Sequence, residues 1–355
     1  MKDWTTRWIG LSGLPPDWPE WAQVSIFVVV LFSVVILPVC GIMLYVERKI
    51  GADLQARVGP NRAGPSGLAQ PLADTLKLLQ KDVLPGGFGQ TVWLVIHAIT
   101  VFATLVGLPV GSALLLLDTD ISAFIPFTGT LALSFGVMLL GLNHGSPSGR
   151  FGALRTVAQA LAGFFPALLC LLYVGMWAGG FSWSAILLAQ GASPVAWMAF
   201  SSPFGFMAFV VFVISGLVML GLPPLDGCGS MSDLRGGVSA SIQGRRLVFY
   251  RVTRFYAFFM WTLVAVTMFL GGAALPDGGA EAIIRFASTR ILAMIEMAVL
   301  VFKTAALMIC IQIIARVTPR IRSDQVTDFS LKVLSPFALV ALAGAALWIG
   351  RGWLS

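Results

Sequence analysis

The stretch from Thr156 to Leu225 contains no Asp, Glu, Lys or Arg. In the whole chain 11% of the 355 residues are charged and 57% are hydrophobic, whereas a soluble domain carries about 25% charged residues. Most of this chain must therefore face lipid. Lipid-exposed backbone has to satisfy its own hydrogen bonds, which leaves helices or closed barrels. The apolar runs are long and do not alternate with period two, so the sequence predicts an all-α, polytopic membrane protein.

We predict eight membrane-spanning helices within a single membrane domain, residues 1–355. The uncharged stretch is too long for one span. We divide it at the two glycines 179–180 and at the small-residue cluster 191–194, and residues 181–190 between them are expected to form an interfacial helix. The first apolar run is too long for a signal peptide, and no small-x-small site follows it. The predicted spans are residues 21–46, 91–117, 123–142, 156–177, 203–222, 255–272, 291–315 and 333–350.

The distribution of basic residues predicts the orientation. The loops after the first, third, fifth and seventh spans hold 17 of the 23 Lys and Arg residues, and basic loops stay on the cytoplasmic side. Both termini are then periplasmic, and the net charge of +7 reflects topology rather than nucleic-acid binding. The excess of Arg over Lys and the high Ala and Gly content favour a bacterial protein of the inner membrane.

Two of the predicted cytoplasmic loops are long enough to contact a soluble partner. The first, residues 47–90, is unusually polar and contains apolar residues at helical spacing over residues 71–84. Pro71 at the start and Pro85 at the end bracket this segment, which predicts an amphipathic helix on the membrane surface. The second large loop, residues 223–250, is Gly-rich and basic.

The sequence contains no recognisable cofactor site. It has only two histidines, its four cysteines are far apart, and it lacks CxxC, HxxxH, GxGxxG and Walker A patterns. An iron–sulfur cluster, a zinc site or a bound metal of any other kind is therefore not expected within this chain. Any electrons must come from a partner chain. The residues concerned are Cys40, Cys170, Cys228, Cys310, His97 and His144; we interpret His97 as a helix–helix hydrogen-bonding residue and the cysteines as apolar packing.

The polar loops carry the most specific motifs. The first loop reads ERKIGA from Glu47, LQARVGPNRAGP from Leu54 and GLAQPLAD from Gly67. The seventh span and the segment after it contain Lys303-Thr304, ARVTPRIRSDQ and KVL. A weaker match is GALR from Gly152, together with Gln159. Over nearly its whole length the chain resembles the H subunit of the proton-pumping NADH–quinone oxidoreductase, respiratory complex I.

This resemblance implies a membrane subunit that joins the peripheral and membrane arms and forms part of the quinone chamber. Quinone is then the substrate, while NADH, FMN and the iron–sulfur clusters belong to partner subunits, and quinone reduction is coupled to proton translocation. The implied partners are the other subunits of both arms, quinone and lipid, with no nucleic acid. The implied quinone-binding or chamber-lining residues are Glu47, Arg48, Lys49, Arg57, Arg62, Asp74, Arg155, Gln159, Asp226, Arg316, Arg320, Arg322 and Asp324.

Charge alone would favour a plainer interpretation, in which these residues only set the topology and contact anionic lipid. The loop motif reverses that preference. Two other classes of function stay open at this point. One is the membrane anchor of a related hydrogenase or other complex-I-like redox complex with a different electron donor, although such relatives generally show a weaker GPNRxGP loop. The other is an independent transporter, against which the sequence shows no inverted repeat and no matched pair of broken helices.

The chain departs from the family pattern where the family has buried acids. Phe164 stands at a family Glu in the fourth span, and Met219 and Leu222 stand at a Glu and an Arg in the fifth. Gly229 and Met231, near the start of the second large loop, stand where the family has acidic residues. Buried carboxylates in membranes commonly persist as proton relays. We therefore hypothesise that the route from quinone to the proton channels is cut or rerouted in this protein.

One acid lies within a predicted span. Glu296 precedes Lys303 by seven residues, so two helical turns place both on one face, about 10 Å apart along the axis. Either the two form an internal ion pair that neutralises itself, or Glu296 and Lys303 serve as a substitute proton relay. The sequence leaves both interpretations open.

Overall fold

The computed structural model describes residues 20–81, 88–109, 115, 117–143, 147–191, 193–226, 238, 242–275 and 289–350. Within these residues the secondary structure is helical, apart from an isolated bridge between Pro109 and Leu115. The predicted all-α fold class is confirmed. Gly229, Met231, His144 and Cys228 lie outside the described residues.

Each of the eight predicted spans lies on a long helix. In chain order these are α2 (Glu20–Val30) continued by the π-helix η1 (Leu31–Ile36) and α3 (Leu37–Asp53), then α5 (Phe88–Val106), α6 (Phe124–Leu142), α7 (Pro147–Ala178), α10 (Pro203–Leu220), α13 (Gly244–Phe269), α15 (Thr289–Val317), and α16 (Ser323–Phe329) continued by η4 (Ser330–Leu334) and α17 (Ser335–Gly350). Over the described residues, seven of them are long and apolar enough to cross a membrane, and the corresponding part of α5, Val95–Val106, is shorter.

Several helices extend beyond the apolar segments that predicted them. Helix α7 begins at Pro147 rather than at residue 156, and α13 begins at Gly244 rather than at residue 255. Hydropathy marks the part of a helix that lies in lipid, whereas backbone hydrogen bonding continues into the aqueous loop. Helix α5 instead ends at Val106, eleven residues before the predicted end of that span, and Pro109 soon afterwards cannot continue a helix.

The surface helices were predicted with small errors at their ends. Helix α4 (Gln70–Leu79) is the amphipathic helix of the first loop, and residues 82–84 of that prediction lie outside the described residues. The predicted interfacial helix is shorter than expected, since α8 spans Trp183–Leu188, where Ser182 accepts a hydrogen bond from the Ala185 backbone N–H. The remaining short helices are η2 (Pro65–Gly67), η3 (Pro194–Ala196) and α9 (Met198–Ser201).

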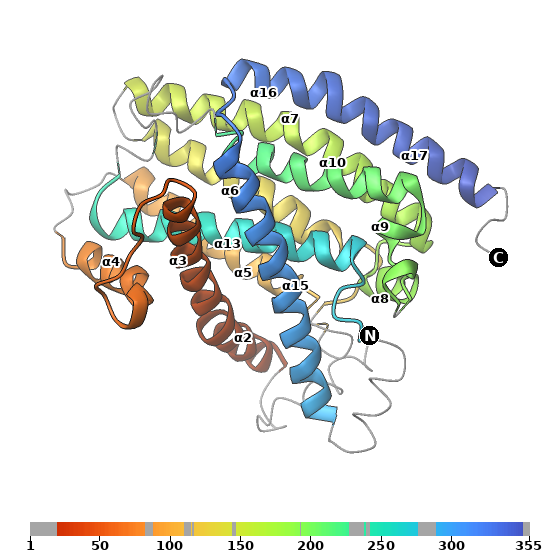
Figure 1. The fold of residues 1–355 in the computed structure, drawn as a ribbon, viewed down its shortest axis with the longest axis horizontal. Coiled ribbons are helices and arrows are strands. Elements are labelled where there is room, and N and C mark those ends of the chain that lie inside the picture. Colours follow the sequence, from red (N-terminus) through yellow and green to blue (C-terminus); the bar gives the residue numbers. More distant parts are fainter. Residues whose placement is uncertain are drawn as a thin grey trace.

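The long helices form a layered bundle with one central helix (Figure 1). Helices α7, α10 and α17 run side by side, while α2–α3 and α15 cross them at a steep angle. Helix α13 lies between these two groups, and from Tyr256 to Phe269 its side chains are buried without interruption. The candidate site lies on the side of α13 that faces α3 and α15.

Close packing holds α10 against α13. The rings of Phe212 and Trp261 stack with centroids 4.4 Å apart, and Trp261 Nε1 donates to the Phe212 carbonyl over 3.2 Å. A Cβ on Gly216 would overlap the Trp261 indole. The absence of a side chain there lets the two helices approach, as is common where membrane helices pack through small residues.

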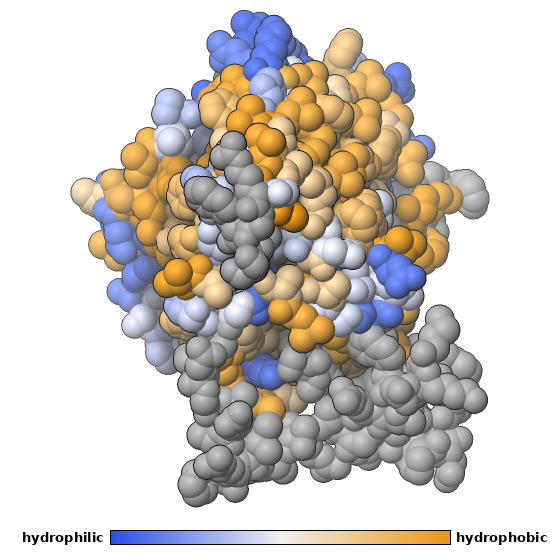
Figure 2. Space-filling model, turned by 90° about the vertical axis from the view of Figure 1, so that its right-hand side faces the viewer, coloured by the Kyte–Doolittle hydropathy of each residue, from blue (hydrophilic) through white to orange (hydrophobic). Residues whose placement is uncertain are grey.

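The outer surface is strongly apolar. Figure 2 shows hydrophobic residues over much of the described face at the α17 end of the molecule. Exposed side chains on three different helices include Val34 at 66%, Phe302 at 74% and Leu347 at 66%. Such broad apolar exposure would aggregate a soluble protein but suits a protein surrounded by lipid and partner helices. The chain is thus a multi-pass membrane protein.

Candidate functional site

A cavity of about 500 Å³ opens between α3, α10, α13 and α15. We call it the main cavity. Part of its wall is apolar, and charged and neutral polar side chains form the rest. An apolar pocket of this size with a few convergent polar groups is typical of a small-molecule site. The lining residues are Leu44, Glu47, Arg48, Leu217, Leu222, Pro223, Asp226, Leu247, Tyr250, Arg251, Arg254, Phe255, Phe258, Ile311, Gln312, Ala315 and Arg316.

A second cavity of about 490 Å³ adjoins the main cavity at the first loop, and we call it the loop cavity. Glu47, Arg48 and Arg316 line both cavities. The other residues that line the loop cavity belong to the first-loop motif; they are Gly51 and residues 57–60. The long motif of the first loop thus forms the polar mouth of an apolar cavity.

Ion pairs fix the helices and the loop around this mouth. Arg316 of α15 donates a hydrogen bond to Glu47 at the end of α3, so the pair joins two helices distant in sequence. Arg48 Nη1 lies 2.5 Å from the Asp74 carboxylate, which also accepts a hydrogen bond from Gln70 Nε2 over 2.9 Å. The Arg48–Asp74 pair holds α4 against the mouth, and the Gln70 bond within α4 orients the carboxylate.

The electrostatics of Asp74 reflect those contacts. Burial by itself raises the pKa of Asp74, but the hydrogen bonds from Arg48 and Gln70, together with the positive charges of Arg48 and Arg251, outweigh it. The pKa of Asp74 therefore lies below its ordinary value. This carboxylate is charged at neutral pH and keeps its partners in place.

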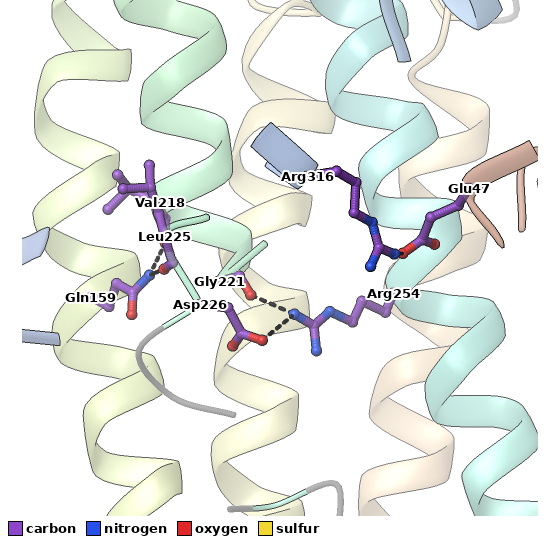
Figure 3. A network of polar contacts seen from close by, with 8 residues as sticks. All are labelled: Glu47, Gln159, Val218, Gly221, Leu225, Asp226, Arg254 and Arg316. Carbon is purple, nitrogen blue, oxygen red and sulfur yellow. Dashed lines mark hydrogen bonds and ion pairs between the residues drawn. The ribbon is translucent and has the colours of Figure 1, made fainter. Parts of the chain in front are cut away.

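A second ion pair contributes to the wall of the main cavity. Arg254 extends from α13 to within 3.6 Å of the Asp226 carboxylate, and it also donates a hydrogen bond to the Gly221 carbonyl. Figure 3 shows this arrangement, with the Glu47–Arg316 pair close by. Asp226 is buried, with 8% of its surface exposed, so a charged partner is needed to offset its loss of hydration.

Gln159 supports the segment that carries Asp226. Its Nε2 donates to the Val218 carbonyl over 3.0 Å and to the Leu225 carbonyl over 2.5 Å (Figure 3). The Ile321 backbone N–H donates to the Pro224 carbonyl over 3.2 Å. Helix α7 and the loop after α15 therefore both fix the chain at the point where α10 ends. Gln159 has a positioning role and does not line the main cavity.

The structure brings together part of the predicted residue set. Glu47, Arg48, Arg57, Asp226 and Arg316 line the main cavity or the loop cavity. Lys49, Asp74, Arg155 and Gln159 line neither of these two cavities. The remaining predicted residues are on the exposed surface: Arg62, Arg320, Arg322 and Asp324.

Sequence reasoning missed the whole contribution of α13 to the main cavity. Leu247, Tyr250, Arg251, Arg254, Phe255 and Phe258 all line the main cavity. Their spacing of three, four, seven, eight and eleven residues from Leu247 is that of one helical face. The expectation of a loop up to residue 250 obscured this spacing. Extending the helix to Gly244 would have placed both arginines beside the aromatic residues.

Lys303 contacts the end of α13 in the structure. Its Nζ donates to the Leu270 and Gly272 carbonyls over 3.1 and 3.0 Å, and it lies 4.2 Å from the centre of the Trp197 ring. A lysine there caps α13, whose last carbonyls have no partner within the helix. The ammonium group thus has partners other than the carboxylate of Glu296, which lies buried on α15.

The positions at which the resemblance implies buried acids are packed with apolar groups. Phe164 contacts Phe127 with ring centroids 4.7 Å apart, and Met219 is 1% exposed. The Met219 carbonyl accepts a hydrogen bond from the Ser134 hydroxyl over 3.1 Å. In the described part of the chain, no group of three or more His, Cys, Asp or Glu residues could hold a metal ion.

Comparison with known proteins agrees with the loop motifs. A family model described as NADH dehydrogenase matches residues 26–346. The H subunit of the NADH-quinone oxidoreductase of Chlorobaculum tepidum is 31% identical over 86% of this chain and 87% of its own. The corresponding subunit of Chlorobaculum parvum is 30% identical over 96% of both chains, and that of Anaeromyxobacter dehalogenans is 28% identical over 93% of this chain and 84% of its own.

Proposed function

Because this chain belongs to the family of the H subunit of NADH-quinone oxidoreductase, a membrane component of respiratory complex I, we propose that its main cavity is part of the quinone-binding chamber of that enzyme. The electrons reach the quinone from partner subunits that carry NADH, FMN and iron–sulfur clusters. This chain supplies the walls, the charges and the membrane anchorage of the chamber.

The observation that carries this proposal is the combination of an apolar wall and a charged wall within one cavity. Phe255, Phe258 and Ile311 offer flat and branched apolar surface for a quinone ring and the start of its tail. Arg251 and Arg254 offer guanidinium donors in the same cavity. Reduction places negative charge on the quinone oxygens, and fixed cationic donors stabilise such charge as it develops.

The polar surface around the loop cavity suits the second part of the function, which is to join the two arms. Tyr45 donates to the Ser66 carbonyl over 2.9 Å, and the pairs of Arg48 with Asp74 and of Arg316 with Glu47 fix the first loop. The exposed arginines of the predicted cytoplasmic loops include Arg62, Arg320 and Arg322. We propose that they meet carboxylates of the peripheral subunits, on the cytoplasmic side of a bacterial inner membrane, with both termini periplasmic.

Coupling to proton translocation is the third part of the proposal. Since Phe164 and Met219 cannot carry a proton, the route must avoid them. Glu296 and Lys303 are the relay candidates within α15. The buried position of Glu296 favours a relay, because an ionisable group inside a membrane is costly and usually serves a function.

Arg254→Leu in the assembled, membrane-embedded complex tests the chamber. We expect NADH–quinone reductase activity to fall by about tenfold, because the cavity loses a donor that stabilises the reduced quinone. Electron transfer from NADH to ferricyanide, which bypasses the chamber, is expected to be unchanged. The matched control is Arg245→Leu, on the same helix but outside the main cavity.

Equal losses for both substitutions, or full activity of Arg254→Leu, would contradict the assignment. The proteins that co-purify with the native chain give an independent check. A flavin-containing dehydrogenase module supports the proposal, whereas a nickel–iron subunit or a chain that purifies alone overturns it.

A further inference from the structure

A third, much smaller cavity of about 50 Å³ lies beside the main cavity. Asp226, Tyr250 and Arg254 line both of them, so these side chains form the partition. Although the small cavity lies among membrane helices and much of its wall is apolar, several polar side chains line it. Besides these three residues the wall contains the hydroxyl-bearing residues Ser134, Thr156 and Thr253, and also His97.

His97 lies on the wall contributed by α5. It is 1% exposed, and its ring centroid is 5.0 Å from that of Trp93 and 6.3 Å from that of Phe249. A Cβ on Gly136 of α6 would overlap the imidazole, so this glycine makes the room for it. Yet Nδ1 of His97 has no hydrogen-bond partner among the described residues. Buried polar atoms without a partner are rare, and an ordered water is a common explanation.

The size and chemistry of the small cavity suit water. One water requires about 10–15 Å³ of such space and two to four polar partners. Ser134, Thr156 and Thr253 already donate their hydroxyl hydrogens to the carbonyls of Met219, Gly152 and Phe249, over 3.1, 2.8 and 2.9 Å. Their oxygens can still accept hydrogen bonds from water. The cavity thus has room for a short water chain and acceptors for it.

We propose that the small cavity holds water and that His97 exchanges a proton through it with Asp226 at the wall of the main cavity. The proposal rests on the chamber function given above. The step moves one proton and no electron: a proton that the Asp226 carboxylate takes up from the main cavity passes through water to the imidazole, which becomes imidazolium while the carboxylate is restored. The reverse step returns the proton to the main cavity.

The surroundings favour His97 for this role. Helices α5, α6 and α10 contain no Asp, Glu, Lys or Arg, and α7 contains only arginines near its start. The titratable or charged groups that line the small cavity besides His97 are Asp226, Tyr250 and Arg254, while α6 and α7 contribute hydroxyls. Histidine is also the side chain best suited to exchange protons near neutral pH.

The chain has only two histidines, which permits a nearly site-specific measurement. We would label the full-length chain with ¹⁵N-imidazole histidine in a His144→Asn background, reconstitute it in lipid bilayers and record solid-state NMR spectra from about pH 3 to pH 9. We expect the His97 signals to convert between neutral and cationic forms and to show magnetisation transfer from mobile water. A His97 that stays in one protonation state and shows no water contact overturns the proposal.

Asp226→Asn tests the connection across the partition. Loss of that negative charge is expected to move the protonation midpoint of His97 to lower pH by about half a unit or more, since the imidazolium loses a nearby counter-charge. Asp328→Asn, which removes an exposed carboxylate on α16, is the control and is expected to leave the midpoint unchanged. Equal shifts in the two variants would refute the link.

These spectra need neither quinone nor electron transfer. If the Arg254 variant shows that the main cavity is not a quinone chamber while the His97 midpoint still responds to Asp226→Asn, the chamber function fails and the proton link stands. If quinone reduction behaves as expected but His97 stays in one protonation state, the proton link fails and the chamber function stands.

Discussion

Among single residues, the charges of the first loop motif acquire their meaning from partners that are far away in sequence. Glu47 is paired with Arg316 across 269 positions, and Arg48 with Asp74 across 26. Half-exposed ion pairs of this kind contribute about 0–1 kcal/mol each. Their main effect is geometric, because they fix which side of the loop lines the mouth of the cavity.

Asp74 gives a prediction with a defined pH dependence. Its pKa is lower in the folded protein than in the unfolded chain, so its contribution to stability is present above the ordinary carboxyl pKa and is lost as the pH falls through the folded pKa. We expect Asp74→Asn to speed amide hydrogen exchange of α4 at pH 7, by roughly two- to fivefold for a contact of this strength. The difference should shrink as the pH falls below the ordinary carboxyl pKa and through the folded one, after correction for intrinsic exchange rates.

Asp328→Asn is the control, because Asp328 pairs with Lys332 on the exposed surface of another helix. A difference between the wild type and Asp74→Asn that persists unchanged in acid would show that the effect does not come from the charge of Asp74.

Glu296 carries the prediction on proton coupling. It is buried on α15, and Lys303 is engaged by the end of α13. We expect Glu296→Gln to lower the number of protons translocated per NADH oxidised by at least about twofold, since an amide cannot pass on a proton. Proteoliposomes with a pH-sensitive dye would measure it. An unchanged ratio would reject the relay.

At the scale of helices, the packing of α10 on α13 depends on one missing side chain. We expect Gly216→Ala to destabilise the protein by about 1–3 kcal/mol, because the added methyl group overlaps the Trp261 indole and forces the helices apart. The unfolding midpoint in detergent would measure the effect.

Gly41→Ala is the matched control for that experiment. Gly41 is also within a membrane helix, but a Cβ there meets nothing within 4 Å. Replacing a helical glycine by alanine without a clash is expected to be neutral or to stabilise by up to about 1 kcal/mol. Similar midpoints for the two variants would contradict the packing argument.

At the scale of the whole molecule, the site forms where helices of different tilt meet. Helices α7, α10 and α17 run side by side, whereas the oblique α3 and α15 diverge from α10 and α13 (Figure 1). The main cavity lies between these four diverging helices, and the first loop adjoins it through the loop cavity. A quinone chamber in this position would be open to a lipid-soluble substrate and to soluble partners at once.

The sequence by itself determined that most of the chain faces lipid, that the fold is helical and to which family the chain belongs. Uncharged runs can be stable only in lipid, basic loops give an orientation to test, and the GPNRAGP segment is specific enough to name relatives. Even the short α4 and α8 were predicted, because proline, glycine and apolar spacing act locally. The first-loop residues Glu47, Arg48 and Arg57, which line the cavities, were among those implied by the resemblance that this motif carries.

Only the tertiary structure decided which charges meet. Hydropathy could not show that α13 begins at Gly244, so Arg251 and Arg254 were missed. Nor could helical spacing show that Lys303 contacts the end of α13. The small cavity, which has His97 in its wall and shares Asp226 and Arg254 with the main cavity, brings together helices from distant parts of the chain. The physical reason is that side-chain contacts depend on helix tilt and packing, and these arise from the shapes of all neighbours together rather than from any one segment.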